Sequence, residues 1–310
     1  KPGGAALARQ RTLTRSFIEG FHAADIRQMS AQSIAPEGGE SPTESASRIG
    51  RVAQGYGALM QWLAADSNRA IHLKSEVRSI RWREGKATVE IRSGSGARTR
   101  RIPARAVIVT VPVGVLAASP HQRGAIAFDP PLPRVASALA GIGVGSVLRL
   151  VVWFRELPWG GDPGHPSFDF LHLPGGPFQV LWTAHPVRWP LAVIWCGGPS
   201  AAELLRGSRT AIERTMHRQL AAALRTTPAR VKASVHRVWV HDWDHDPYAR
   251  GAYTYARVGG SNAYAALARP EQGTLFFAGE ATDAEGGTVE AALRSGIRAA
   301  RQVARVLSRG

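Results

Sequence analysis

The stretch from residue 274 to the C-terminus constrains the fold of this chain most. It opens with an apolar run of strand-forming residues over 274–278, continues through a Gly-rich segment over 279–287, and ends in a helical pattern over 288–307. Glu290 falls in the first turn of that helix and arginines fall near its end, as the helix dipole favours. A buried strand that leads through glycines to a helix N-terminus presents free backbone N–H groups to an anionic or electron-rich ligand. A terminal strand and helix that only pack on a sheet would show the same spacing, so spacing alone leaves both readings open.

The residue order in this stretch is more specific than its spacing. The segments LFFAGEAT and GGTVEAALRSGIRAA closely resemble the C-terminal signature of the flavin-dependent amine oxidase family, which includes monoamine, polyamine and L-amino-acid oxidases. The resemblance implies FAD as the cofactor, with Glu280 on its ribityl side and Gly279 and Gly287 among the cofactor-binding residues. It also implies that Thr288 and Val289 begin a helix whose N-terminus faces the N1/O2 edge of the flavin. A helix N-terminus stabilises the negative charge that reduction places at that edge.

Length and composition bound what the remainder can be. With 310 residues, 44% of them hydrophobic, the chain can bury a sizeable core and fits one large or two ordinary domains. It contains no apolar run of about 18 residues, the length that crosses a bilayer. The single cysteine, Cys196, excludes an internal disulfide framework and lies in an apolar run that predicts core. A cytoplasmic location is the default expectation.

The net charge of +16 raises the question of an anionic partner. The arginines are scattered along the whole chain, with no basic block and no interleaved aromatic residues. Arginines 294, 298, 301 and 305 do line one helical face, but such stripes are usually solvated. We therefore expect no nucleic-acid partner. The partner that the resemblance implies is a small-molecule amine, with O₂ or another compound as electron acceptor.

The start of the sequence departs from the family pattern. The family begins with a strand, a G-x-G-x-x-G turn and a helix that together hold the FAD pyrophosphate, and this unit is missing. Gly141, Gly143 and Gly145 precede an apolar run over 147–154, whereas the fingerprint must follow a strand and open a helix. Gly94 and Gly96 fall in a predicted hairpin turn. We therefore expect a fragment, or a relic that has lost half of its cofactor site, that does not retain FAD.

The first 115 residues predict helices followed by a sheet. A helical pattern covers 7–33, and the segment 35–47, rich in Pro, Gly, Ser and Glu, predicts a flexible connection. A short helix is predicted over 58–65. Strands are predicted over 71–73, 77–83, 87–92, 98–102 and 106–111, the last as the continuous β-branched run of a covered parallel strand.

Two anchors of this block, EVRSI and RAVIVTVPVGVL, resemble the second cofactor-domain segment of the family. The resemblance implies that Val77 meets the adenine through its backbone and that Pro112 lies among the cofactor-binding residues. An ordinary sheet with a hairpin explains the alternation of residues equally well. Only the resemblance therefore points to adenine.

The predicted strand over 147–154 carries the first candidate catalytic residue. Its sequence, SVLRLVVWFRELPW, resembles a family strand that carries a lysine linked through water to the flavin N5, and the matching residue here is Arg149. Arginine does not give up its proton and has a larger planar head, which changes any water arrangement. A surface arginine on an edge strand is the alternative. Further strands are predicted over 178–183, 191–195 and 235–240, and helices over 201–205 and 211–224.

The segment HDWDHD at 241–246 combines two histidines four residues apart with three acids. A metal site at that spacing needs a helix, whereas Pro247 and the preceding strand predict a loop. No metal is therefore expected.

The same loop continues into the second candidate catalytic residue, Tyr253. The pattern W…DPYARGAYTY resembles the family motif whose Gly-x-Tyr tyrosine forms one wall of the substrate site beside the flavin. The resemblance also implies Trp243 as a cofactor-binding residue. An aromatic wall suits an amine, because the carbon chain is apolar and a residual cation favours a π face. The opposite wall is aromatic in some monoamine oxidases, and Thr288 occupies the matching place here.

The implied fold class is α/β: an FAD/NAD(P)-binding, Rossmann-like domain, incomplete at its N-terminus, interleaved with an α+β substrate domain that has a mixed sheet. Segment 1–47 supplies substrate-domain helices and a linker, and segment 48–115 the middle of the FAD-binding domain. Segment 116–268 supplies the substrate-binding domain, and segment 269–310 the C-terminal strand, loop and helix of the FAD-binding domain.

The implied reaction is FAD-dependent amine oxidation. A hydride moves from the amine α-carbon to flavin N5, the imine is hydrolysed, and O₂ or another acceptor reoxidises the flavin. No residue is a convincing general base. Two alternatives remain open: a sister flavoenzyme that desaturates carotenoid- or porphyrinogen-type substrates, and a non-catalytic truncated relic or binding module.

Overall fold

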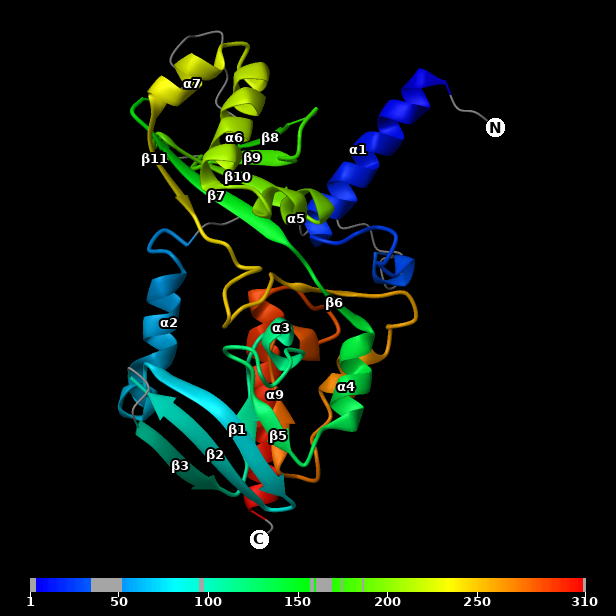
Figure 1. Ribbon diagram of the computed structural model, residues 1–310, viewed down its shortest axis with the longest axis vertical. Helices are drawn as coiled ribbons and strands as arrows, with labels where there is room; N and C mark the ends of the chain where they lie inside the picture. The colour runs from blue at the N-terminus through cyan, green and yellow to red at the C-terminus, as the bar shows by residue number, and fades with distance from the viewer. Residues whose placement is uncertain are drawn as a thin grey trace.

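The computed structural model describes residues 4–34, 52–94, 98–156, 159, 169–173, 175–185 and 187–308, and it forms two bodies (Figure 1). The upper body holds a five-stranded sheet covered by helices α5, α6 and α7. The lower body holds the smaller sheets and the long C-terminal helix α9. The predicted connection over 35–47 lies outside the described residues.

The upper sheet has the strand order β11-β7-β10-β9-β8, and its neighbouring strands are all antiparallel. The mixed sheet expected in the segment 116–268 is therefore not this one: the parallel strand of that segment, β5 (Ala127–Asp129), pairs with β1 (Ser75–Arg83) in the lower body. Parallel neighbours need a long crossover, whereas β8, β9 and β10 follow one another as hairpins. The strands are β7 (Val147–Phe154), β8 (Phe170–His172), β9 (Val180–Thr183), β10 (Leu191–Gly197) and β11 (Val235–Val240).

The two faces of the upper sheet differ in burial. Along β7, Leu148, Leu150, Val152 and Phe154 are fully buried and pack in the core under the helices. The alternate residues of β7 point to the other face, because side chains alternate along a strand. Trp195 of the neighbouring strand lies on that other face, where its ring stacks on that of Tyr253. The covering helices are α5 (Pro199–Leu205), α6 (Arg209–Ala223) and α7 (Pro228–Ser234).

The lower body contains a four-stranded sheet of order β3-β2-β1-β5, in which only β5 is parallel to its neighbour. The predicted strand over 71–73 is wrong: Leu73 and Lys74 form a turn, with Lys74 in the left-handed region at φ 53°. The strands are β1 (Ser75–Arg83), β2 (Lys86–Ser93), β3 (Arg98–Ala104) and β5 (Ala127–Asp129).

The parallel strand predicted over 106–111 is confirmed over a shorter range, but it is not covered on both faces, since Ile108 is 38% exposed. It is β4 (Val107–Val109), which pairs in parallel with β13 (Leu275–Phe277). Just before β13, the buried Thr274 hydroxyl accepts from the Gly85 N–H at 2.7 Å, and its one hydrogen is shared between the carbonyls of Gln272 at 3.0 Å and Arg83 at 3.2 Å. The C-terminal strand is therefore tied to the β1–β2 turn as well as to β4.

Segments from several parts of the chain share the lower core. That core includes Ile80 of β1, Val135 of α4 and Leu267 of α8, all nearly fully buried. The division of the chain into domains at 116 and 269 remains a prediction, although β5 and α4, which lie beyond 116, pack in this lower core. The short helices here are α2 (Tyr56–Ala64), α3 (Val113–Leu116), α4 (Pro133–Ala140) and α8 (Ala263–Leu267), with 3₁₀ turns at Ala65–Ala70 and Glu280–Thr282.

The N-terminal helix α1 (Ala5–His22) is shorter than the predicted pattern over 7–33. It ends because Ala23 adopts a left-handed conformation, φ 53° and ψ 25°, that interrupts the helical hydrogen bonds. A short 3₁₀ turn, Ala31–Ser33, follows further along. Figure 1 shows α1 projecting beside the upper sheet and reaching toward the loops between the bodies.

Helix α9 (Val289–Leu307) confirms the C-terminal helix prediction, with Thr288 as its N-cap. Small residues, Ala291, Ser295 and Ala299, form its buried side. The large apolar residues at the predicted helical spacing are instead exposed: Val289 at 44%, Leu293 at 39% and Ile297 at 53%. Small side chains let α9 approach β13 closely, so the larger side chains are left on its other side.

The glycines at 141, 143 and 145 serve packing. Gly143 lies in β6 (Ile142–Val144), which pairs with β12 (Thr254–Ala256). A side chain at Gly143 would come within 2.2 Å of the Tyr255 ring, so the glycine gives that ring room to lie across the strand. This agrees with the prediction that these glycines are not a phosphate-binding turn.

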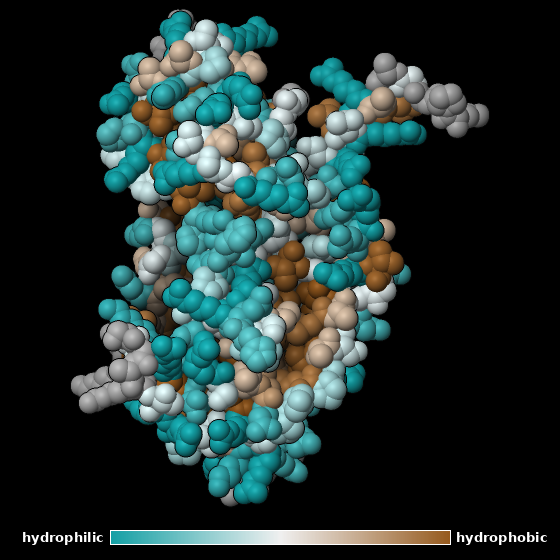
Figure 2. Space-filling model, in the orientation of Figure 1, coloured by the Kyte–Doolittle hydropathy of each residue, from teal (hydrophilic) through white to brown (hydrophobic). Residues whose placement is uncertain are grey.

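The molecular surface is hydrophilic over most of the face shown in Figure 2, with apolar residues gathered in a hollow in its lower half. Within the described part of the chain, no helix is both long and apolar enough to cross a membrane.

Candidate functional site

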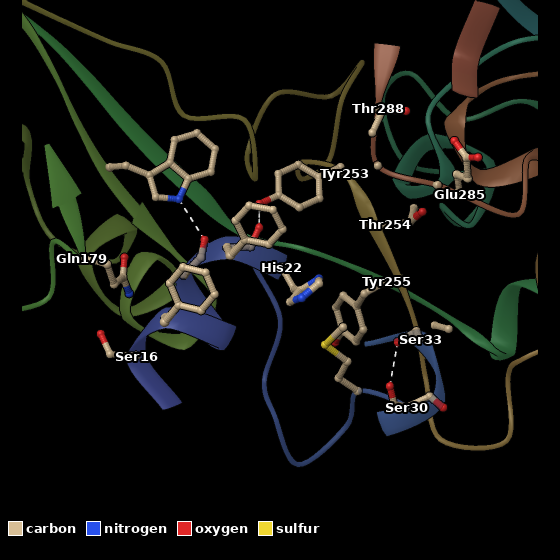
Figure 3. Close-up of a pocket in the computed structure, with 18 of the residues that line it drawn as sticks. Ser16, His22, Ser30, Ser33, Gln179, Tyr253, Thr254, Tyr255, Glu285 and Thr288 are labelled. Carbon is tan, nitrogen blue, oxygen red and sulfur yellow. Dashed lines mark hydrogen bonds between the residues drawn. The ribbon is translucent and has the colours of Figure 1, made fainter. Parts of the chain in front are cut away.

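A cavity of about 1880 Å³ lies where the two bodies meet (Figure 3). Its walls come from the second half of α1, strands β8 to β10, strand β12 and the Gly-rich loop that leads into α9. Three of the sequence-predicted site residues line it: Tyr253, Gly287 and Thr288. The candidate substrate wall and the candidate flavin-facing loop therefore border one space.

Tyr253 is held rigidly in the cavity wall. Its ring lies nearly parallel to that of Trp195, with ring centroids 6.5 Å apart and 15° between the planes. Its carbonyl accepts from the Gly145 N–H at 2.9 Å, which anchors the loop to the β6–β7 connection. Burial raises the pKa of the Tyr253 phenol, so the hydroxyl remains protonated and acts as a donor at neutral pH.

The C-terminal end of α1 is capped by two aromatic side chains of this wall (Figure 3). Trp195 Nε1 donates to the Gly20 carbonyl at 2.9 Å, and the Tyr253 hydroxyl donates to the Phe21 carbonyl. The last carbonyls of a helix lack partners within the helix, so these side chains satisfy them. The hydroxyl of Tyr253, and not only its ring, therefore fixes α1 against the wall.

An aromatic row extends from Tyr253 along the cavity. Trp195 contacts Trp182 at 5.9 Å between ring centroids, and Trp182 contacts Phe170 at 6.1 Å. We call Phe170, Trp182, Trp195 and Tyr253 the aromatic row. These rings come from β8, β9, β10 and the loop before β12, so the row crosses three neighbouring strands.

Glu280 closes the Gly-rich loop onto β12. Its Oε2 accepts from the Gly287 N–H at 2.7 Å and from the Thr254 hydroxyl at 2.8 Å. The Thr254 oxygen also lies 3.1 Å from the Tyr264 hydroxyl. Because Thr254 gives its only hydroxyl hydrogen to Glu280, Tyr264 must be the donor in that contact. Burial raises the pKa of Tyr264 to about 12, so this donor keeps its proton.

An ion-pair cluster holds the other side of the same loop. Arg294 on α9 donates to Asp283 Oδ1 at 2.8 Å and to Glu285 Oε2 at 2.6 Å. The Arg294 guanidinium lowers the pKa of the Asp283 carboxyl by hydrogen bonding. Arg298 donates to the Phe277 carbonyl at 3.0 Å. The prediction of a solvated arginine stripe is therefore wrong for Arg294 and Arg298, since both side chains bond the strand–loop–helix unit.

The loop and helix have features that suit the ribityl–flavin part of FAD. Gly279 follows β13 with φ 139° and ψ 167°, a conformation open essentially only to glycine, and nothing lies within 4 Å of where a side chain would be. The Thr288 hydroxyl caps Ala291 N at 3.0 Å, which leaves the first two N–H groups of α9, on Val289 and Glu290, without intrahelical partners. An open backbone beside a helix N-terminus fits an electron-rich ring edge.

The other implied cofactor residues lie away from the cavity wall. Val77 lies in β1 at an irregularity in the pairing with β2. Pro112 precedes α3, close after β4, and is exposed. Trp243 is 44% exposed, and its carbonyl accepts from Gly251 N at 2.9 Å, so it closes the loop that carries Tyr253. Their roles toward a cofactor remain predictions.

Arg149 lies directly opposite Trp195 in the β7–β10 pairing, and its side chain therefore points to the same face of the sheet. It is exposed and is not part of the described cavity wall. The alternative of a surface arginine on an edge strand is right about the exposure but wrong about the edge, because β7 lies between β10 and β11. The role of Arg149 near the cofactor remains a prediction.

The two histidines of the HDWDHD segment bond separate acids. His241 Nε2 lies 2.8 Å from Asp246 Oδ2, and His245 Nδ1 lies 2.8 Å from Asp242 Oδ2. The segment is a loop, as predicted. Over the described ranges, no group of three or more His, Cys, Asp or Glu residues could hold a metal ion.

Sequence reasoning missed most of this site, including Trp182 and Trp195 of the aromatic row and the polar pair Thr254 and Tyr264. No polar residue interrupts LAVIWCG, so the sequence does not show that Trp195 lies opposite the buried Ala192, Ile194 and Cys196. Thr254 and Tyr264 act through Glu280, which is distant in the sequence, and no local pattern marks that contact.

Comparison with known proteins places this geometry in context. The sequence pattern of flavin containing amine oxidoreductases matches residues 2–304. Lysine-specific histone demethylase 2 of Homo sapiens is 31% identical over 260 residues, which cover 81% of this chain and 30% of that protein. Polyamine oxidase 1 of Oryza sativa subsp. japonica is 30% identical over 290 residues, which cover 80% of this chain and 55% of that protein.

Among solved structures, a double mutant of putrescine oxidase superposes with a TM-score of 0.77 at 22% sequence identity, covering 98% of this chain and 66% of that one. At this identity the likeness concerns the fold. The chain spans about a third of the demethylase and about half of the polyamine oxidase that it matches.

Proposed function

The chain belongs to the flavin-containing amine oxidoreductase family, whose cofactor is FAD, and on that premise we propose that it forms the substrate side of an amine-oxidising enzyme. The observation that carries the proposal is the shared cavity. Tyr253 and Trp195 line one part of it, and the loop at Gly287 and Thr288 lines another. An amine held by the aromatic rings would thus lie beside the loop that the family uses for its flavin.

The proposed cofactor contacts fall on the strand–loop–helix unit. Gly279 would let the ribityl chain approach the backbone, and the α9 N-terminus at Val289 would stabilise negative charge on the ring. Glu280 would take a ribityl hydroxyl through Oε1, because Oε2 already accepts two internal hydrogen bonds. Val77, Pro112 and Trp243 would complete the cofactor side, and Arg149 would approach it from the sheet face.

When bound, FAD would supply the hydride acceptor for oxidation of the amine to an imine, which water hydrolyses. The contribution of this chain is positioning. Tyr253 and Trp195 present flat apolar faces that would orient the substrate carbon and exclude water. The Tyr253 hydroxyl stays protonated and bonded to the Phe21 carbonyl, so it would not serve as a base. We propose O₂ or another compound as the final electron acceptor.

The test compares FAD with riboflavin as ligands of the purified chain. The described residues offer contacts to the ring and ribityl group, and the sequence has no G-x-G-x-x-G turn for the pyrophosphate. We therefore expect weak binding of both flavins, with FAD tighter by no more than about tenfold, since riboflavin lacks both the pyrophosphate and the adenine and only the adenine has a proposed contact, at Val77. Quenching of flavin fluorescence measures both constants.

A matched pair of variants locates the site in the same assay. Glu280→Ala removes the proposed ribityl contact and should weaken both flavins, whereas Glu203→Ala, an exposed acid on α5, should change neither. Absence of binding by either flavin would contradict the proposed contacts. Binding of FAD more than about 100-fold tighter than riboflavin would show a pyrophosphate site that the proposal does not contain.

A further inference from the structure

We propose that this cavity selects amines with a single amino group on an aromatic or bulky apolar carbon skeleton, and disfavours polyamines and basic peptides. The inference rests on the proposed function and narrows its substrate class. Two independent properties of the cavity wall carry it: the arrangement of aromatic rings and the scarcity of charge.

Aromatic rings reach the cavity from two parts of the chain. The upper sheet and its neighbouring loop supply the aromatic row of Phe170, Trp182, Trp195 and Tyr253. On α1, Phe17 and Phe21 stack at 5.7 Å between centroids with 15° between their planes, and both line the cavity. Flat apolar rings from both parts of the chain suit an aromatic or branched apolar group.

The described wall contains one fully charged side chain. Glu285 is its only Asp, Glu, Lys or Arg residue, and its carboxylate lies 2.6 Å from Arg294, which is not part of the wall. Glu285 is also 71% exposed at the rim. Burial lowers the pKa of His22, which favours its neutral form. The polar side chains that remain are the His172 imidazole, hydroxyls and amides, such as those of Ser16, Thr254 and Gln179.

This charge distribution discriminates by the number of ammonium groups. A single amino group can be satisfied by hydroxyl oxygens and by the face of a ring. Each additional ammonium group must lose water, and among the described wall residues it meets only the Glu285 carboxylate, which Arg294 already pairs, so its burial is unfavourable. The net charge of +16 on the chain adds a long-range penalty for polycations. Spermidine and arginine-rich peptides are therefore poor ligands for this wall.

Calorimetric titration of the 310-residue chain, with and without added FAD, tests the inference with three probes: 2-phenylethylamine, spermidine, and a basic peptide that contains N-methyl-lysine. We expect 2-phenylethylamine to bind at least about tenfold more tightly than either of the others. Equal or tighter binding of spermidine or of the peptide overturns the inference and leaves the proposed function standing. If none of the three amines binds, both are overturned.

Two variant pairs assign the selectivity to the wall. Trp182 and Trp239 point to the same face of the upper sheet, because Trp182 pairs with Val193, Val193 with Val151, and Val151 with Trp239. Only Trp182 lines the cavity. Trp182→Ala should weaken 2-phenylethylamine about fivefold, whereas Trp239→Ala should leave it unchanged. Equal effects of the two substitutions would place the ligand outside the aromatic row.

The second pair adds a carboxylate. Ser16 and Gln10 both lie on α1, but only Ser16 lines the cavity (Figure 3). Ser16→Glu should tighten spermidine about two- to fivefold, while Gln10→Glu makes the same change in net charge and should have little effect. If both tighten spermidine equally, net charge and not the wall controls binding, and the inference fails.

Discussion

Replacement of Glu280 by alanine should destabilise the lower body even when no flavin is present. Glu280 Oε2 accepts from the Thr254 hydroxyl and from the Gly287 N–H, at 2.8 and 2.7 Å. A hydrogen bond to a charged group contributes about 1.5–3 kcal/mol to stability. Thr254 is only 7% exposed, so its hydroxyl cannot turn to water, whereas the exposed Gly287 N–H can. The free energy of unfolding should therefore fall by less than the contribution of two full hydrogen bonds, by about 2–3 kcal/mol.

Urea unfolding of the flavin-free chain, followed by circular dichroism, measures this loss. Glu280→Gln keeps an acceptor oxygen but removes the charge, so we expect a smaller loss of about 1 kcal/mol. Thr254→Val removes the donor, and the double variant should show a coupling energy of about 1 kcal/mol with Glu280→Ala. Hydrogen exchange of the segment 279–288 should speed up in each case, because this is the loop that Glu280 closes.

Glu285→Ala is the matched control from the same loop. Its carboxylate is 71% exposed and paired with Arg294, and an exposed pair contributes less than about 1 kcal/mol. A Glu280→Ala protein that differs from the parent by no more than Glu285→Ala would refute the reasoning. The Gly-rich loop would then be held by its ion pairs, and the network from Tyr264 to Glu280 would be without energetic consequence.

Three further outcomes follow from the same contacts. Tyr253→Phe should lower the free energy of unfolding by about 1 kcal/mol through loss of the hydrogen bond to Phe21. Tyr253→Ala should also reduce kcat/KM of a reconstituted enzyme at least about tenfold. Equal turnover per folded molecule in the parent protein and in both variants would contradict the wall assignment. Burial lowers the pKa of His22 and His217 below 6.5, so the unfolded chain binds more protons than the folded chain just below that pH. The free energy of unfolding should therefore fall as the pH drops from 6.5. His217→Asn should flatten this pH dependence, and an unchanged pH profile in the variant would contradict the role of His217. Burial raises the pKa of the Cys196 thiol, so a thiol reagent should react with it only after unfolding, which absorbance of the released thiolate can follow.

Local patterns predicted the C-terminal unit well. The strand, the loop and α9 are continuous in the sequence, so capping, glycine placement and helical spacing all act within about 35 residues of one another. Tyr253 belonged to a recognisable motif, and the structure places it in the cavity wall. Features that depend on nearby residues were therefore accessible from the sequence.

Contacts between distant segments were not accessible. Tyr253 bonds the carbonyl of Phe21 across 232 positions, and Trp195 bonds that of Gly20 across 175 positions, and neither carbonyl has a side-chain signature. The end of α1 was missed because Ala23 adopts its left-handed conformation without the glycine that usually marks it. The exposed apolar residues of α9 were missed because periodicity identifies an apolar face but not whether the described chain covers it.

The Thr274 hydroxyl joins Gly85 to the last strand across 189 positions of the chain. During synthesis, the hairpin of β1 and β2 leaves the ribosome long before β13 does. Strand β4 stays unpaired over the same interval, because β13 is its only partner strand among the described residues. Contacts of such long range are slow to form, because a large loop must close before any of them can stabilise the product. The lower body should therefore be the last part of a nascent chain to become protease-resistant, and a chaperone that shields open strand edges would meet it during that interval.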